Sequence, residues 1–455
     1  MVSSSQPAQI ADRDPVNFSE VVAHQPPSTW AWYGLFVLVG AMVLSLVNLQ
    51  LIYVLAEPFK ESFSLSDTKM GMLTGLALGL TTAFATYPMG WLSDRVNRQW
   101  LLAGCVLIWT IATAACGFAQ SYNQLFLGVM GIALGEAVLG PIVYSIIPDL
   151  FPENRRVFAN YIFFGASILG ASLGLALSGG LIATIDALKE SHGLFESLET
   201  WRLTLMASAV PGPAVALSIV LMKLSRPPQA EDQEKERARI LPFARQHWRS
   251  LLGVFFGFGL SFSAKSTMFV WAPPALVRLF GEGQAAVGIR LGSITAISSV
   301  LGVATSAAAY RFLSKRWRHL AAPRLAQIFL LVGTASLAML LMTPNTAFAY
   351  VILFLFGGAA TGAMSLSPTM LQDISPPDIR GRIIALGGLV AVLIGAGTPL
   401  LVGVVSDAVD DTGRGLLAAM VGVGVPLLLL SVFCLKFGEK TLHATIQASR
   451  KPFGV

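Results

Sequence analysis

Long apolar stretches recur along the whole chain and are separated by short polar segments. Each stretch is about 20 residues or longer, which at about 1.5 Å per residue crosses a hydrocarbon core of about 30 Å. Because apolar and polar residues do not alternate within them, the pattern predicts helices and argues against a β-barrel. Twelve spans are predicted, at residues 32–56, 70–92, 101–119, 125–148, 159–186, 203–223, 250–275, 288–313, 322–342, 347–370, 383–405 and 414–435.

One long polar segment divides the spans into two sets of six. Polar motifs recur at matching places in both sets: GWLSDR follows span two and RFLSKR follows span eight, while PENRR follows span four and PDIRGR follows span ten. Parallel repeats of this kind place a substrate site between the halves near the bilayer midplane. The predicted organisation is a flexible cytoplasmic tail at 1–29, six-helix bundles at 30–224 and 248–436, a cytoplasmic linker at 225–247 between them, and a cytoplasmic tail at 437–455.

Composition strengthens the membrane assignment. The chain is 54% hydrophobic and 12% charged, against about 25% charged residues in soluble domains. Its Lys and Arg gather in the segments on the same side as both termini, which predicts that both termini are cytoplasmic. The net charge of +6 is therefore explained by basic residues on the cytoplasmic side of the membrane, and no nucleic-acid partner is expected.

Several kinds of chemistry lack their motifs. The three cysteines fall inside apolar spans and the histidines in tails, linkers or loops, so neither a disulfide framework nor a metal site is predicted. The sequence has no phosphate-binding loop and no nucleophile elbow. An enzyme is not predicted, and no cofactor is expected.

The segment GWLSDRVNRQW after span two carries the first specific signature. Its pattern, G-x-L-x-D-R-x-x-R, resembles the signature between the second and third helices of the major facilitator superfamily. The resemblance implies a cytoplasmic gate, with Asn97 where glycine is usual and Lys315 in place of the aspartate in the second-half copy. The residues assigned to this gate are Gly90, Asp94, Arg95, Arg98, Arg155 and Arg156.

Three further segments, LAEPFKESFSLSDTKMGMLTG, GEAVLGPIVYSIIPDLFPENRRVFA and VWAPPALVRLFG, together resemble the spinster-like branch of that superfamily. This resemblance implies export of amphipathic lipids, such as lysophospholipids or sphingosine-phosphate-like molecules, driven by protons or passive. The chain departs from the branch at two places. Asn48 and Leu49 replace an acidic and basic pair in the first helix, and Val129 replaces an arginine ahead of the G-E-A glutamate.

Two isolated charges remain deep in the predicted spans, one in each half. Glu136 lies within span four and Lys265 within span seven. A charge in the bilayer centre costs about 2.5–3.5 kcal/mol on insertion scales, so each is expected to face a cavity or a partner. We hypothesise that Lys265 receives the anionic headgroup of a substrate and that Glu136 balances charge or carries a proton. A direct ion pair across the cavity and separate satisfaction within each half are the alternatives.

Weaker candidates for substrate contact are Asn48, Gln50, Tyr144 and Trp271. Helix-contact hydrogen bonds are an equal reading for the first three, and an interfacial anchor is an equal reading for Trp271. The predicted function is transport of an amphipathic, anionic lipid or lysolipid by alternating access, by a monomer in a bacterial inner membrane. The alternatives are a small-molecule or drug efflux antiporter, and a lipid sensor or scaffold that no longer transports.

Overall fold

The computed structural model describes residues 29–93, 95–137, 139–192, 197–222, 242–376, 379–409 and 412–449. Within these ranges the chain is helical and contains no strand. The helices that contribute to the first half, the N-half, are α2 (Thr29–Val54), α3 (Ala56–Phe63), α4 (Asp67–Gly71), η1 (Met72–Leu80), α5 (Thr81–Ser93), α6 (Arg98–Gly117), α7 (Tyr122–Glu136), α8 (Leu139–Leu150), α9 (Glu153–His192), α10 (Thr200–Ala209) and α11 (Gly212–Val220). Those of the second half, the C-half, are α13 (Trp248–Phe280), α14 (Gln284–Trp317), α15 (Ala321–Met339), α16 (Thr346–Met364), α17 (Ser367–Asp373), α18 (Arg380–Val409) and α19 (Gly413–Ser449), with 3₁₀ turns η2 (Arg318–Leu320) and η3 (Leu340–Met342).

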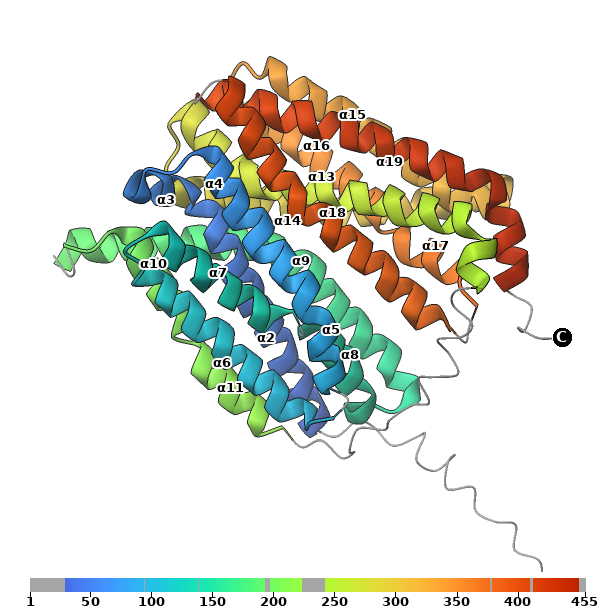
Figure 1. The fold of residues 1–455 in the computed structure, drawn as a ribbon, viewed down its shortest axis with the longest axis horizontal. Helices are drawn as coiled ribbons and strands as arrows, with labels where there is room; N and C mark the ends of the chain where they lie inside the picture. Colours follow the sequence, from blue (N-terminus) through green and yellow to red (C-terminus); the bar gives the residue numbers. More distant parts are fainter. Residues whose placement is uncertain are drawn as a thin grey trace, which may run out of the picture.

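The two halves lie side by side, the N-half in blue to green and the C-half in yellow to red (Figure 1). Ten stretches of the described chain are long and apolar enough to cross a membrane. One of them, Gln284–Met342, holds two spans, and the segment from α4 to α5 adds another that η1 interrupts. The predicted twelve-helix, two-bundle architecture is confirmed.

Four spans are interrupted, and prolines account for three of the interruptions. Pro141 falls in the first turn of α8, Pro211 directly precedes α11, and Pro368 falls in the first turn of α17. A proline in a first helical turn loses no hydrogen bond, but its ring disfavours helical geometry just before it. The fourth interruption is the π-helical stretch η1, for which the sequence offers no comparable marker.

The bundle has two distinct ends. We call the end that holds the start of α2 and the end of α19 the tail end. The opposite end holds α3, α4 and the close of α13, and we call it the latched end for the contacts described below. The last helix continues to Ser449, well past the span end predicted at 435, because Leu442 and Ile446 remain buried along one face of it. Part of the segment predicted as a tail at 437–455 is thus helix packed on the C-half.

Exposed tryptophans gather at the tail end. Those more than one-third exposed begin or end helices there: Trp30, Trp32, Trp91, Trp100 and Trp248. Tryptophan is enriched at membrane–water interfaces, so this group of tryptophans marks one of the two membrane–water interfaces.

Candidate functional site

Glu136 is the last residue of α7, at the point where span four is broken. The hydroxyl of Ser45, on α2, hydrogen-bonds the carboxylate. The second oxygen, Oε1, is buried and has no hydrogen-bond partner among the described residues. A buried carboxylate oxygen without a partner is costly. The arrangement leaves Glu136 able to accept a proton or a polar group of a ligand.

Lys265 lies in the middle of α13 and is held by one hydroxyl. Its Nζ donates to Oγ1 of Thr361, on α16, over 2.8 Å. Ser299, on α14, lies 3.3 Å from the same hydroxyl. Among the described residues, no carboxylate lies within ion-pairing distance of Lys265. Within the described part of the chain, the cation therefore has no counter-ion in this conformation.

Glu136 and Lys265 do not pair with each other here. Each is partnered within its own half, by Ser45 in one case and by Thr361 in the other. The direct ion pair considered as an alternative is absent from this conformation, whereas separate hydroxyl partners are present.

An apolar pocket of about 310 Å³ lies next to Lys265, toward the tail end. It is lined by residues of α13, the α16–α17 region and α18, including Phe258, Phe262, Met364, Gly388 and Ala391. Phe262 is one helical turn from Lys265, and Met364 is one turn from Thr361 on α16. Lys265 itself does not line the pocket but lies one turn beyond its Phe262 wall, so an apolar chamber and a cation are neighbours on α13, an arrangement that suits an amphipathic anion.

The weaker candidates occupy different surroundings. Asn48 is fully buried and neither atom of its amide has a partner among the described residues. Gln50 is also buried, with its side chain beside Gly174 of α9. Tyr144 is 43% exposed, with its ring edge against Phe163.

Trp271 is 1% exposed, and its indole donates to the carbonyl of Pro399, on α18. It therefore fastens two helices of the C-half and does not reach the membrane surface, so the interfacial-anchor reading is wrong.

Those residues of the cytoplasmic gate that the structure describes form contacts within the N-half only. Arg98 donates to the Ser145 carbonyl over 3.0 Å and lies 3.6 Å from Asp149. Arg95 lies over the ring of Trp91, at 3.7 Å.

Among the described residues, the other members of this motif also make no contact with the C-half. Arg155 is exposed, Nε of Arg156 has no partner within the described chain, and a Cβ at Gly90 would meet nothing within 4 Å. Asp94 lies outside the described residues. The described members of the motif therefore do not join the halves in this conformation.

The halves are instead joined at the latched end by a buried ion-pair network. Asp67 begins α4 and is fully buried; Arg278, at the end of α13, donates to both of its oxygens, over 2.8 and 2.6 Å. Lys60 and Ser406 donate to the same carboxylate, each over 2.7 Å. Arg278 also donates to Glu57, over 2.8 Å. Because Arg278 and Ser406 belong to the C-half, Asp67 links both halves.

Asp407 reinforces this link by capping a helix of the other half. Its carboxylate accepts from the backbone N–H groups of Asp67 and Thr68 over 2.9 and 2.8 Å, and from the Thr68 hydroxyl over 2.6 Å. A negative charge at the first N–H groups of a helix is favourable. We call Glu57, Lys60, Asp67, Thr68, Arg278, Ser406 and Asp407 the latch.

The latch keeps Asp67 ionised. Burial alone would raise the pKa of this carboxyl, but hydrogen bonds from Arg278, Lys60 and Ser406 and the charge of Arg278 outweigh it and lower the pKa to about 2. This cluster is not evident from the sequence, because its N-half and C-half members are separated by more than 200 residues and only the fold brings them together. The one indication in the sequence was that residues of opposite charge, such as Asp67 and Arg278, lie at the ends of different spans.

Glycines let the halves approach closely beside the latch. A Cβ at Gly71, Gly75 or Gly79 of the α4–η1 segment would collide with α18 at residues 396–400, and one at Gly403 would collide with the backbone of Asp67. On the other flank, Gly179 of α9 touches Gly288 of α14 in the same way. At Gly90, about 16 Å farther toward the tail end than Gly79, nothing lies within 4 Å. The halves are in contact at the latched end and separate toward the tail end.

Two six-helix bundles, joined at one end and holding isolated charges between their ends, are the architecture of a membrane transporter. The family model of the Major Facilitator Superfamily matches residues 35–399. The chain belongs to the Major Facilitator Superfamily, and it is an integral, multi-pass membrane protein of the spinster-like kind.

Its relatives support this assignment. It is 29% identical to an MFS-type efflux pump of Mycolicibacterium smegmatis, over 85% of this chain and 87% of the relative. It is 25% identical to the mouse (Mus musculus) sphingosine-1-phosphate transporter SPNS2, over 85% of this chain and 72% of the relative. A solved bacterial homologue of the human lysosomal transporter Spinster, in an inward-facing and occupied conformation, superposes with a TM-score of 0.75 at 24% identity, covering 94% of this chain and all of that chain.

Proposed function

We propose that this transporter moves an amphipathic lipid or lysolipid with an anionic headgroup by alternating access. The observation that carries the proposal is the half-buried Lys265 in the middle of α13, which donates to the Thr361 hydroxyl and has no counter-ion among the described residues. A desolvated cation of this kind favours an anion that enters its cavity. A phosphate or carboxylate headgroup meets that requirement.

The apolar pocket next to Lys265 accounts for the remainder of the ligand. Phe258 and Phe262 supply aromatic walls, and Gly388 leaves open space, since a Cβ there would meet nothing within 4 Å. Burying an alkyl chain is favourable by about 0.8 kcal/mol per methylene. The relative that is named a sphingosine-1-phosphate transporter fits a substrate of this class.

We further propose that both termini are cytoplasmic, in a bacterial inner membrane, and that the chain acts as a monomer. Tryptophans and arginines gather at the tail end, as in the contact of Arg95 with Trp91, and basic residues favour the cytoplasmic side. On this orientation the conformation is inward-facing, and the substrate enters from the cytoplasm or the inner leaflet.

Glu136 is the proposed carrier of a coupled proton. Its unpartnered oxygen and its hydroxyl contact to Ser45 make it the titratable group of the N-half centre. Coupling predicts that an imposed pH gradient changes uptake by the native chain, and that Glu136→Gln abolishes this response. A gradient response that survives Glu136→Gln would assign the proton to another group.

Reconstituted proteoliposomes test the headgroup assignment. Uptake of a fluorescent anionic lysophospholipid is compared with that of a cationic amphiphile of the same chain length. Lys265→Met is expected to lower the anionic rate at least tenfold, while Lys265→Arg retains part of it. Lys436→Met, which removes an exposed lysine paired with Glu439, is the matched control. Wild-type rates in Lys265→Met would overturn the headgroup assignment.

The pocket has its own test. Gly388→Leu places a side chain in the open space and is expected to slow long-chain substrates more than short-chain ones. Gly422→Leu is the control, because Gly422 also has open space around it but lies on α19, away from this pocket. Equal slowing of long and short chains would argue against an alkyl-chain site.

Efflux of small, non-lipid molecules is the second candidate, because the Mycolicibacterium relative is named an efflux pump. The two candidate functions can be distinguished by the substrate that is transported. Drug uptake that survives Lys265→Met, together with no uptake of anionic lysolipid, would favour efflux of small molecules.

A further inference from the structure

A second large cavity lies away from the central charges. It has a volume of about 790 Å³ and is formed where the ends of α6 and α9 face α10 at the latched end. Apart from Gln120 and two cations, its lining is apolar, with Phe118, Leu188 and Val210 all more than 40% exposed. The cavity is therefore a groove on the outside of the N-half, open to the surrounding lipid.

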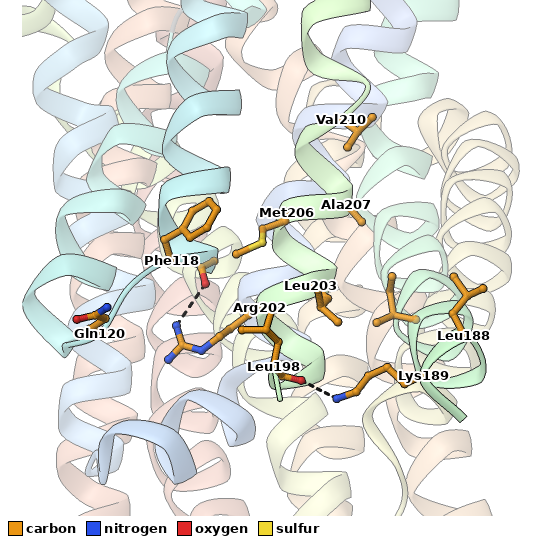
Figure 2. Close-up of a pocket in the computed structure, with 12 residues that line it drawn as sticks. Phe118, Gln120, Leu188, Lys189, Leu198, Arg202, Leu203, Met206, Ala207 and Val210 are labelled. Carbon is orange, nitrogen blue, oxygen red and sulfur yellow. Dashed lines mark hydrogen bonds between the residues drawn. The ribbon is translucent and has the colours of Figure 1, made fainter. Parts of the chain in front are cut away.

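Both charged residues that line the groove are cations, Lys189 and Arg202. Figure 2 shows them at the same end of the groove, on either side of Leu198, with Met206, Ala207 and Val210 farther along α10. Arg202 and Val210 are eight residues apart, so the apolar wall extends about 12 Å from the cations. Lys189 and Arg202 lie near the ends of their spans, at the level where headgroups of one leaflet lie.

Contacts with the protein hold both cations in place and leave donors available. Lys189 donates one hydrogen bond, to the Leu198 carbonyl over 2.6 Å. Arg202 uses Nη1 for the carbonyls of Gly117 and Ala119 and Nε for Glu199. Within the described part of the chain, Nη2 of Arg202 and the two other hydrogens of Lys189 make no hydrogen bond. Two oriented cations with free donors match the oxygens of one phosphate group.

We propose that this groove binds a membrane phospholipid, with its headgroup phosphate between Lys189 and Arg202 and an acyl chain along α10. Charge complementarity selects the occupant: the acidic residues nearby, Asp186 and Glu199, bond to Thr200 and Arg202 and do not line the groove. The site is separate from the transport pathway, because it lies on the outer surface of the N-half while Lys265 lies in the C-half.

Thermal stability of the purified protein in detergent tests the proposal. Added dioleoylphosphatidylglycerol is expected to raise the Tm, since a ligand that binds only the folded state stabilises it. Dioleoylglycerol, which has the chains without the phosphate, and glycerol 3-phosphate, which has the phosphate without the chains, are each expected to give less than half of that rise. A rise with dioleoylglycerol equal to that with phosphatidylglycerol would overturn the phosphate contact.

Two variants locate the site. Lys189→Gln is expected to weaken the apparent affinity for phosphatidylglycerol about fivefold, the equivalent of about 1 kcal/mol per basic residue at a lipid headgroup. Leu203→Trp fills the groove and is expected to abolish the Tm rise. Leu217→Trp, at a 60% exposed position on α11, is the control and keeps it. An unchanged rise in both groove variants would overturn the site.

Lys265→Met separates this proposal from the proposed function. It is expected to retain the full lipid-dependent Tm rise even where transport is lost. Loss of that rise in Lys265→Met would place the lipid in the central cavity instead of the groove.

Discussion

The two ends of the bundle differ in what holds the halves together. At the latched end, Asp67 is shared between Arg278 and Ser406 of the opposite half, and Asp407 caps α4. At the tail end the comparable charges, such as Arg98 with Asp149, remain within one half. Every hydrogen bond between the halves, among the described residues, lies at the latched end.

Two kinds of contact hold the halves together at the latched end. The glycines of the α4–η1 segment let its backbone pack directly against α18, and the latch adds buried ion pairs. Both must be broken together for the latched end to open. The conformation is therefore expected to depend on a few residues at one end, and much less on those at the other.

Arg278→Ala should have the largest effect, because it leaves Asp67 buried without its bidentate partner. Loss of one member of a buried ion pair costs about 3–5 kcal/mol, which is enough to make the latched conformation a minority. The measurement is the distance between spin labels at Val96 and Lys315, both exposed near the tail end, in a chain without its three cysteines. The label distance should shorten as the tail end closes.

A matched variant controls for loss of charge at the same end. Arg290→Ala removes a 58% exposed arginine paired with Glu282 inside the C-half, and it should leave the label distance unchanged. If Arg278→Ala also left the distance unchanged, the latch would not determine the conformation.

Gly403→Ala should have the next largest effect. Its added Cβ would collide with the Asp67 backbone, and overpacking of this kind costs about 1–3 kcal/mol. The same label pair should report a partial shift toward the shortened distance. Gly397→Ala, six residues away on α18 with nothing within 4 Å of its Cβ, should show none. Equal behaviour of the two variants would show that close contact at Gly403 is unimportant.

The fold was predictable from the sequence because long apolar runs and a repeated pair of polar motifs report directly on spans and halves. The interruptions were less accessible. Pro141 marks the start of α8, but η1 has no residue that distinguishes it from an α-helix. The extension of α19 was missed because its buried Leu442 and Ile446 are spaced along one face and do not form a continuous apolar run.

The candidate site was predictable in part. Glu136 and Lys265 are isolated charges in apolar spans, so their positions inside the bundle followed from the sequence alone, and both side chains are half-buried there. Their hydroxyl partners, Ser45 and Thr361, did not, because those contacts join distant segments. The latch was missed for the same reason: Asp67 and Arg278 look like ordinary residues at span ends until the halves are packed.

Arg98→Ala should have a small effect on this conformation. Arg98 is 21% exposed and its contacts with Ser145 and Asp149 stay within the N-half. A partly exposed ion pair contributes about 0–1 kcal/mol, so the Tm should fall slightly and the tail-end label distance should stay the same. A changed distance would mean that the motif joins the halves through contacts beyond those described.

Acidification should have the smallest effect on the latch. A carboxyl whose pKa is lowered on folding stabilises the folded state above its unfolded pKa of about 3.9, and that contribution is lost as the pH falls through the folded value of about 2. Between pH 8 and pH 5 Asp67 therefore stays ionised, and the label distance should not move. Asp67→Asn, which removes the charge at every pH, should shorten the distance throughout this range and serves as the positive control. A distance that changed with pH in the native chain and also in Asp67→Asn would place the proton-sensitive group elsewhere, and Glu136→Gln would then test whether the N-half carboxylate is that group.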